Sequence, residues 1–596
     1  MASITDLPEE VIAHILKIKI LSIEDIMNFS STCTKFDQLI EQNNKLCEKK
    51  FYDRCPTADK KYDKQKKKRI FDRLNFKEQM KKGLQYINKL HYYVSLMTEN
   101  ELTDTTKKEL ESLMVFIAKN SLNYYFVYDE LNGIIVKELS CSSNANLTFT
   151  YNIDLIFDCL KQYRFIYKQT AFLNMPKKNK LFERQLIIVA QYFLPNLSYS
   201  IIKTWLDNIA EEVKSRLKDK YPTHEIFSTS PEQFFIWKET NIDDHIWTDK
   251  TDVTSIMSIL EEYIFSDLNI NDFYKLLSPD FIAYTNSVSE HLRKHILTNI
   301  YRSTARRLGV RCDLAANYET TISIAWKPEY KKEDWDDGEY FYLNKGPNTY
   351  PSNITKKRCP EGFLIKPLND VWMVHLMMTL FHQVSPRNIP YKWKFNIFST
   401  LLLPSFNLEP INIEIECKKV TESLMVKSKH TITQSNQRKE MVKYAVGMIV
   451  RFSSRDYRNS DFQYFDGVII DWHYYRNCPF KNILDTSRQI EYMYPCENCL
   501  PLMIRENRDV VNEPHYTVLT DNNTIIYHVI QNEIFMCPPR EINNIEIGRY
   551  FSKFEGTHYV LNKSLADRYP EDSAAIVQFY SPYFRRQWQS SEGILP

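Results

Sequence analysis

The sequence predicts a multidomain α+β protein with an N-terminal three-helix segment, a large mainly helical middle region and a C-terminal small β-barrel. Apolar residues recur at helical spacing in the first fifty residues and again in many segments up to about residue 308. After residue 441, short alternating segments are separated by turn residues, which is typical of strands. A length of 596 residues is too great for one hydrophobic core, so several domains are expected.

The first fifty residues contain three short segments with the apolar spacing of helices. Pro8 suits the first helical position, where no backbone N–H is needed. Ser22, with Asp25 three residues later, is a capping-box start for the second helix. Three such short helices cannot bury all their apolar side chains among themselves, so the rest of the chain or another protein must cover some of them. The apolar positions are Leu7, Val11, Ile12, Ile15 and Leu16, then Ile23, Ile26, Met27 and Phe29, then Cys33, Phe36, Leu39 and Ile40.

These residues resemble the F-box family. The resemblance lies in the opening Leu7–Leu16, the acidic pair Glu24–Asp25 and the S-x-x-C-x-x-F spacing of Ser30–Phe36, although Leu46 stands where the family usually has tryptophan. The alternative is an ordinary helical cap that packs on its own domain. The resemblance implies that one set of residues docks on the Skp adaptor of a cullin–RING ubiquitin ligase. That set is Leu7, Pro8, Val11, Ile12, Ile15, Leu16, Ile26, Phe29, Cys33 and Phe36.

Composition excludes several classes of protein. The net charge of +2 gives no global attraction to nucleic acid or to a membrane surface. No run of 18 apolar residues and no signal peptide occurs, so no membrane partner is expected. With 11 glycines and no Gly-rich phosphate-binding motif, the chain is expected to bind no cofactor. The 12 cysteines lack the spacing of a disulfide framework and fit a reducing compartment, the cytoplasm or the nucleus.

A helix and a strand near residue 300 resemble the transglutaminase-like, SirB1-type family. The matching parts are Ala305–Val310, in which Gly309 is a helix cap, and the strand that ends at Trp326. Catalysis of this type needs a cysteine thiolate at a helix N-terminus and an activating histidine. Cys312 follows its helix instead of opening it, and the family's histidine position falls on Thr321. We therefore predict a fold used for binding, with no catalytic residue on this chain. The class left open, a cysteine hydrolase, would need a reactive cysteine near a histidine.

Four segments near the C-terminus alternate like strands, at 444–452, 465–472, 515–521 and 525–530, and suggest a small barrel. They resemble the YccV/HspQ family, also called the hemimethylated-DNA-binding domain. Phe452 replaces a histidine of the family, and residues 476–510 are an insertion. The matching residues include Gly447, Val450, Gly467, Val468, Ile469, Trp472, Tyr516, Val518, Leu519, Asp521 and Glu533.

Charge argues against DNA binding by this domain. Acidic residues outnumber basic ones by two over residues 441–540, which is the wrong sign for neutralising phosphates, although Arg451, Arg455 and Arg458 could form a small patch. A basic stretch at 60–69 suits either a nucleic-acid patch or, as we prefer, a solvated helix face. The lone C-x-x-C at Cys496–Cys499 has no second pair at zinc spacing, so no metal is expected.

The chain is expected to divide into five regions. They are an F-box at 1–55, a helical linker region at 56–115, a transglutaminase-like region at 116–330, a loop and helical connector at 331–440, and the YccV/HspQ-like barrel with a C-terminal tail at 441–596. Near the connector, composition predicts a long loop at 329–362, a buried helix at 371–382 and a polar linker at 427–439.

The sequence favours a substrate-recognition subunit of an SCF (Skp–cullin–F-box) ubiquitin ligase. The expected partners are the Skp adaptor, the cullin and a protein substrate that the sequence does not name. The catalytic contribution would be proximity, because the chain would hold a substrate near the ubiquitin-loaded enzyme. The alternative is a DNA-binding or chromatin-associated protein that acts through its C-terminal domain.

Overall fold

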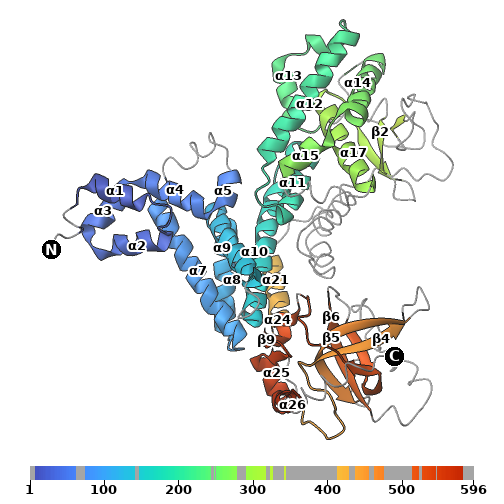
Figure 1. The fold of residues 1–596 in the computed structure, drawn as a ribbon. Helices are drawn as coiled ribbons and strands as arrows, with labels where there is room; N and C mark the ends of the chain where they lie inside the picture. Colours follow the sequence, from blue (N-terminus) through green and yellow to red (C-terminus); the bar gives the residue numbers. More distant parts are fainter. Residues whose placement is uncertain are drawn as a thin grey trace. The chain divides into compact units, whose positions relative to one another are not determined.

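The structure is a computed structural model (Figure 1). It describes residues 4, 7–61, 74–140, 146–242, 247, 250–277, 290–316, 322–326, 341–343, 413–428, 436–455, 462–474, 513–521, 526–544 and 546–580. Contacts divide the chain into two compact units. Unit 1 consists of Met1–Arg54, Asn75–Leu160 and Lys418–Pro596, and unit 2 consists of Cys55–Leu74 and Lys161–Cys417. The five predicted domain boundaries stay predictions.

The N-terminus folds into the three predicted helices, α1 (Glu9–Leu16), α2 (Ile23–Thr32) and α3 (Thr34–Gln42), followed by α4 (Asn44–Arg54) and α5 (Pro56–Lys61). The predicted capping box is confirmed: Ser22 N donates to Asp25 Oδ2 at 2.8 Å, and Asp25 N donates to Ser22 Oγ at 3.1 Å. Pro8 directly precedes the first helical residue, Glu9, one position earlier than predicted. Helix α4 was not predicted, and it contributes buried Leu46 and Phe51 to the core.

The next helices of unit 1 form a bundle with α4. They are α7 (Phe76–Thr98), α8 (Asp104–Lys119), α9 (Ser121–Ser140) and the first half of α10 (Leu147–Leu173). The bundle joins α4 through aromatic packing, because the ring of Phe51 lies 5.7 Å from that of Phe76 and 5.5 Å from that of Phe126. Figure 1 shows α7, α8 and α9 as neighbouring helices. The N-terminal helices therefore share a core with this bundle.

Unit 2 is built around α17 (Glu290–Arg307). The other helices are α11 (Phe182–Phe193), α12 (Tyr199–Lys220), α13 (Pro231–Glu239), α14 (Lys250–Glu262) and α15 (Ile270–Leu277). Helix α17 ends as predicted: Gly309 has φ +76°, and its N–H donates to Arg306 O at 3.1 Å. A side chain at Gly309 would collide with the Trp237 ring, so the close packing also needs glycine.

A three-stranded antiparallel sheet follows α17, in the order β1 (Asp313–Ala316), β2 (Ile322–Trp326) and β3 (Phe341–Leu343). Strand β2 confirms the predicted strand, and Ile324 and Trp326 are buried. Strand β3 corrects the predicted loop at 329–362, because Phe341–Leu343 is an apolar segment that pairs with β2 despite its polar surroundings. The predicted helix at 371–382 lies outside the described residues.

The C-terminal part of unit 1 is a curled antiparallel sheet in the order β7-β6-β5-β4-β8, which confirms the predicted small β-barrel as a half-barrel. The strands are β4 (Ile449–Arg455), β5 (Phe462–Tyr474), β6 (Pro514–Thr520), β7 (Ile526–Ile530) and β8 (Ile534–Met536). Strand β4 begins five residues later than predicted, because Gly447 adopts φ +99° in a preceding turn. At this turn a Cβ on Gly447 would lie 2.5 Å from Tyr559 O.

The remaining elements are α21 (Ile413–Ser428), α24 (Ile547–Tyr550), β9 (Phe551–Phe554), β10 (Tyr559–Leu561), α25 (Lys563–Arg568) and α26 (Asp572–Phe579). The predicted linker at 427–439 is wrong at both ends. Residues 427–428 complete α21, and Arg438 is fixed by donating to Asp572 Oδ1 at 2.8 Å and to Val442 O at 2.7 Å. The sequence does not show the pairing of Arg438 with Asp572, because Asp572 lies 134 residues further along the chain. None of the described helices combines the length and the apolar run that crossing a membrane requires.

Candidate functional site

The apolar residues of α1 divide between the core and the surface. Ile12 and Leu16 are buried, whereas Val11 is 42% and Ile15 is 37% exposed. Val11 and Ile15 are four residues apart, so they lie on the same side of the helix. Further exposed apolar residues directly precede and follow the helix. We call the exposed set the N-terminal apolar surface. It consists of Leu7, Pro8, Val11, Ile15, Ile18 and Ile20.

The ten residues of the predicted docking set therefore fall into three groups. Ile12, Leu16, Ile26 and Phe36 are buried in the chain's own core, and Leu7, Pro8, Val11 and Ile15 are exposed. Phe29 and Cys33 are half-buried, and the Phe29 ring stacks on that of Phe36 at 4.0 Å. The sequence pattern marks apolar positions but does not separate those that face the core from those that face solvent.

Ile18 and Ile20 were not predicted to belong to this surface, and they lie in the segment between α1 and α2. Ile20 is 90% exposed, and the backbone that carries both residues is fixed by Lys50 of α4. Lys50 Nζ donates to Ile18 O at 2.6 Å and to Leu21 O at 2.8 Å. Burial lowers the pKa of Lys50. The signal in the sequence was the alternation of Ile18 and Ile20 with Lys17 and Lys19 in a turn, where large apolar side chains are unusual.

Arg54, at the end of α4, fixes the N-terminal helices to the bundle. Its guanidinium donates two hydrogen bonds to Glu24 of α2, each of 2.8 Å, and Nη2 donates to Glu130 of α9 at 2.7 Å. These carboxylates raise the pKa of Arg54 above its usual value, so the group stays charged. Because Arg54 makes two contacts with each carboxylate, its guanidinium is held in one orientation, and the N-terminal helices, α1 among them, are fixed to the bundle.

The motif residues of the C-terminal sheet are mostly core residues. Trp472, at 3% exposure, donates from Nε1 to Asp572 Oδ2 at 3.1 Å, and that carboxylate also accepts from Val446 N at 2.8 Å. Gly467 is needed for close packing, because a Cβ there would lie 2.5 Å from Val518 Cγ1. The buried motif residues are Val450, Val468, Ile469, Trp472, Tyr516, Val518 and Leu519.

The other two motif residues of the sheet are polar. Asp521 accepts from Asn543 N at 2.6 Å and pairs with Arg540, while Glu533 is half-buried in the short helix before β8. Arg540 also donates to Asp466 at 3.2 Å, and Arg451 donates to the same carboxylate at 2.7 Å. Arg451 and Arg540 therefore share a carboxylate partner. Arg458, the insertion and its Cys496–Cys499 pair lie outside the described residues.

Cys312 is buried and follows α17, as the sequence predicted. Burial and the neighbouring Asp313 raise the pKa of its thiol far above the usual value, so the thiol stays neutral. Burial likewise raises the pKa of Cys537 to about 11. Neutral thiols are poor nucleophiles, and these two sites do not suit cysteine chemistry. Within the described ranges, no three His, Cys, Asp or Glu side chains gather closely enough to hold a metal ion.

Comparisons with known proteins bear on both ends of the chain. Residues 442–558 match the family model described as "Hemimethylated DNA-binding protein YccV like". The chain is similar to F-box only protein 21, with 23% identity to the Pongo abelii protein and 22% to those of Homo sapiens and Mus musculus. In each case 96% of this chain and 92% of the relative are covered. No solved structure matches the chain. The predicted resemblances to an F-box protein and to the YccV family are confirmed, and the transglutaminase-like resemblance stays a prediction.

Proposed function

We propose that this chain is the substrate-recognition subunit of an SCF ubiquitin ligase, which promotes ubiquitination and degradation of protein substrates. The observation that carries the proposal is the N-terminal apolar surface, a group of exposed apolar side chains on and directly beside a helix whose other side is buried. The similarity to F-box only protein 21 along most of the chain supports the same function. The Skp adaptor would cover this surface and connect the chain to the cullin.

The surface has the composition of a protein interface. Its apolar centre is bordered by the exposed charged residues Glu9, Glu10, Lys17 and Lys19. An apolar centre inside a polar rim is the usual anatomy of such interfaces. Covering one side chain of the size of leucine or isoleucine contributes about 1 to 3 kcal/mol, so a few of them suffice for stable binding.

The chain itself would contribute proximity. Its other domains would hold a protein substrate, which raises the effective concentration of substrate lysines near the ubiquitin-loaded enzyme. The raised thiol pKa of Cys312 opposes a cysteine hydrolase that uses this residue. Cys33, Cys47, Cys312 and Cys537 carry free thiols, which suits a reducing compartment such as the cytoplasm or the nucleus.

Replacing Val11 by aspartate tests the proposal. The substitution places a charge in the centre of the docking surface, and we expect adaptor affinity to fall at least about 100-fold, because an unpaired buried carboxylate is costly. The matched control is Val136→Asp on α9, since Val136 is 55% exposed in the same unit. The measurement is co-purification of the full chain with the Skp adaptor and cullin.

Both variants should keep the thermal unfolding of the wild type, because neither position is buried. The double variant Leu7→Ala, Pro8→Ala should also lose the adaptor. If Val11→Asp co-purifies with the adaptor at wild-type level, the docking surface is wrongly assigned. If Val136→Asp loses the adaptor to the same extent, the effect is not specific to α1.

DNA binding is the second candidate, favoured by the description of the family model that matches residues 442–558. The shared carboxylate partner of Arg451 and Arg540 opposes it, because a phosphate would compete with Asp466 for both guanidinium groups. Titration of the full chain with hemimethylated DNA at several salt concentrations separates the two candidates. Phosphate contacts would give a steep loss of affinity with salt, and we expect no saturable binding.

A further inference from the structure

Unit 2 contains a cavity of about 350 Å³ at the C-terminal end of α17. Four segments of the same unit line it: the loop before α11, the residues that follow α13, the last turns of α17, and the stretch that leads into β1. Its size exceeds that of a single small anion, so a group attached to the anion also fits. No residue of this cavity belongs to the N-terminal apolar surface or to the C-terminal sheet.

The lining of the cavity is strongly basic. Among the lining residues that the structure describes, five are cationic and two, Glu183 and Asp313, carry carboxylates, which leaves an excess of three positive charges at neutral pH. Asp313 pairs with Arg311 at 3.6 Å. Phe182, Val310 and the neutral thiol of Cys312 form apolar walls around this charge. The cationic residues are Lys177, Lys180, Arg302, Arg306 and Arg311. Charges of one sign against low-dielectric walls focus the field on a ligand of the opposite sign.

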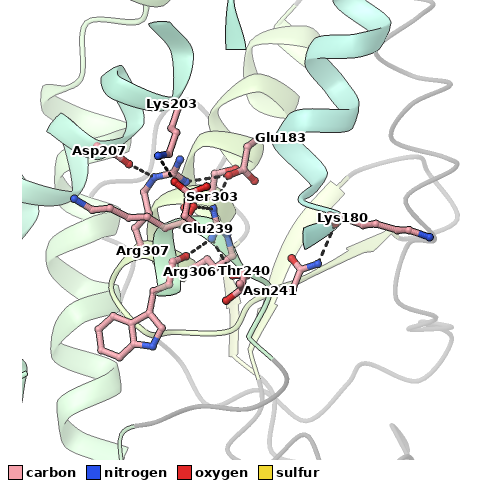
Figure 2. A network of polar contacts seen from close by, with 12 residues as sticks. Lys180, Glu183, Lys203, Asp207, Glu239, Thr240, Asn241, Ser303, Arg306 and Arg307 are labelled. Carbon is pink, nitrogen blue, oxygen red and sulfur yellow. Dashed lines mark hydrogen bonds and ion pairs between the residues drawn. The ribbon is translucent and has the colours of Figure 1, made fainter. Parts of the chain in front are cut away.

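The inner wall is fixed by a buried ion network, drawn in Figure 2. Arg306 donates from Nη2 to Glu183 Oε1 at 2.5 Å and from Nη1 to Thr240 O at 3.0 Å. Arg307 donates to the same Glu183 oxygen at 3.1 Å and to Asp207 Oδ1 at 2.8 Å. Burial opposes ionisation of Glu183, but the two guanidinium groups lower its pKa below the usual value. The network therefore stays charged and holds Arg306 in place.

The outer wall is fixed by Asn241. Its Nδ2 donates to Lys180 O at 2.9 Å and to Lys177 O at 3.3 Å, and its backbone N–H donates to Lys178 O at 2.7 Å. Figure 2 shows Asn241 next to Lys180, whose long side chain extends away from the ion network of Glu183, Arg306 and Arg307. The two lysines thus stand on a loop whose backbone is held in position before any ligand arrives. A preorganised site loses less entropy on binding.

We propose that this cavity binds a phosphate monoester, carried either by a small molecule or by a peptide side chain. A phosphate dianion matches the excess positive charge better than a single carboxylate does, and lysine and arginine are its usual partners. The rest of the cavity accommodates the group to which the phosphate is attached. The neutral thiol of Cys312 takes no part in bond making, so the site binds without chemistry. The proposal does not depend on the ubiquitin-ligase function.

Calorimetric titration of the full chain tests the proposal, with inorganic phosphate, O-phosphoserine and a short peptide bearing one phosphoserine as probes. The variant is Lys177→Gln, Lys180→Gln, because these two side chains line the cavity and are not among the residues that form the ion network in Figure 2. We expect at least about a tenfold loss of affinity, since a hydrogen bond to a charged group is worth that much or more. The control is Lys218→Gln on α12, an exposed lysine outside the cavity, which should bind as the wild type does.

The probes also identify the source of the phosphate. Tighter binding of the phosphopeptide than of O-phosphoserine would support a protein ligand, and equal binding would support a small phosphorylated molecule. The proposal is overturned if no probe binds the wild type. It is also overturned if the peptide without phosphate binds as tightly as the phosphopeptide. The same holds if Lys177→Gln, Lys180→Gln and the control Lys218→Gln both bind the probes with wild-type affinity.

Discussion

The N-terminal helices and the C-terminal sheet both carry family motifs, but they use the motif residues differently. In the helices, Leu7, Val11 and Ile15 stay exposed although they belong to the motif. In the sheet, the apolar and aromatic motif residues, Trp472 and Tyr516 among them, are buried. The helical motif thus specifies a surface, whereas the sheet motif specifies a core. A sequence resemblance among exposed residues therefore indicates a shared partner, whereas a sequence resemblance among buried residues indicates a shared fold.

The largest expected effect concerns the core of the C-terminal sheet. Asp572 is 1% exposed and accepts hydrogen bonds from Val446 N, Trp472 Nε1 and Arg438 Nη1. Replacing it by alanine leaves three donors without this acceptor, one of them a charged guanidinium, and we expect a loss of about 3 to 5 kcal/mol in unfolding free energy. Amide hydrogen exchange of β4 and β5 would report the loss.

Asp567→Ala is the matched control for this prediction, because Asp567 is exposed on α25 a few residues away. Its exchange should resemble that of the wild type. Equal protection of β5 in both variants would mean that Asp572 is not the polar centre of this core, and the contrast between core and surface motifs would weaken.

Two isoleucines of α1 test the division within the N-terminal helices. Ile12 is 1% and Ile15 is 37% exposed, although both belong to the same predicted docking set. Ile12→Ala should cost about 2 to 5 kcal/mol of stability, because it leaves a cavity. Ile15→Ala should change stability by less than about 0.5 kcal/mol and instead weaken adaptor binding. Ile12→Ala should therefore lower the unfolding temperature more than Ile15→Ala does, and Ile15→Ala should weaken adaptor binding more than Ile12→Ala does. If one variant shows the larger loss in both measurements, the division into core and surface residues is contradicted.

Two glycines give a smaller contrast of the same kind. Gly467 lies in β5, where a Cβ would come within 2.5 Å of Val518 Cγ1 and 2.8 Å of Leu519 O, so Gly467→Ala should destabilise by about 1 to 3 kcal/mol. Gly133 lies in α9 with no atom within 4 Å of its added Cβ, so Gly133→Ala should stabilise by about 0.5 to 1 kcal/mol. Opposite shifts in the unfolding temperature are expected, and a stable Gly467→Ala variant would show that the sheet relaxes easily.

The sequence allowed prediction of features that depend on neighbouring residues. The Ser22–Asp25 capping box, the end of α17 at Gly309 and the strand at Ile322–Trp326 are local patterns, and each is confirmed. Features that join distant segments were not predicted. The ion pair of Arg438 with Asp572 spans 134 residues, and nothing near either residue indicates the other.

The same limit applies to the candidate surface and to the basic cavity. Helical spacing locates an apolar stripe, but which half of the stripe the bundle covers depends on α4 and on Arg54, whose partner Glu130 lies 76 residues away. The cavity joins segments near residues 180, 241 and 306, and its charge becomes visible only when they meet. Local sequence patterns therefore predict the helices and strands, whereas contacts between distant segments determine which residues stay exposed to partners.

The smallest expected effect tests whether local caps shape the docking helices. Ser22→Ala removes the side-chain acceptor of Asp25 N and should cost about 1 kcal/mol, and exchange of the first turn of α2 should rise. Ser31→Ala on the same helix is the control, because Ser31 only donates to Asn28 O at an exposed position. Hydrogen bonds from Ser22 lower the pKa of Asp25 below its usual 3.8. The cap therefore stabilises fully above that pH and progressively less as the pH falls below it. An exchange difference between the wild type and Ser22→Ala that does not shrink at acidic pH would contradict the reciprocal cap.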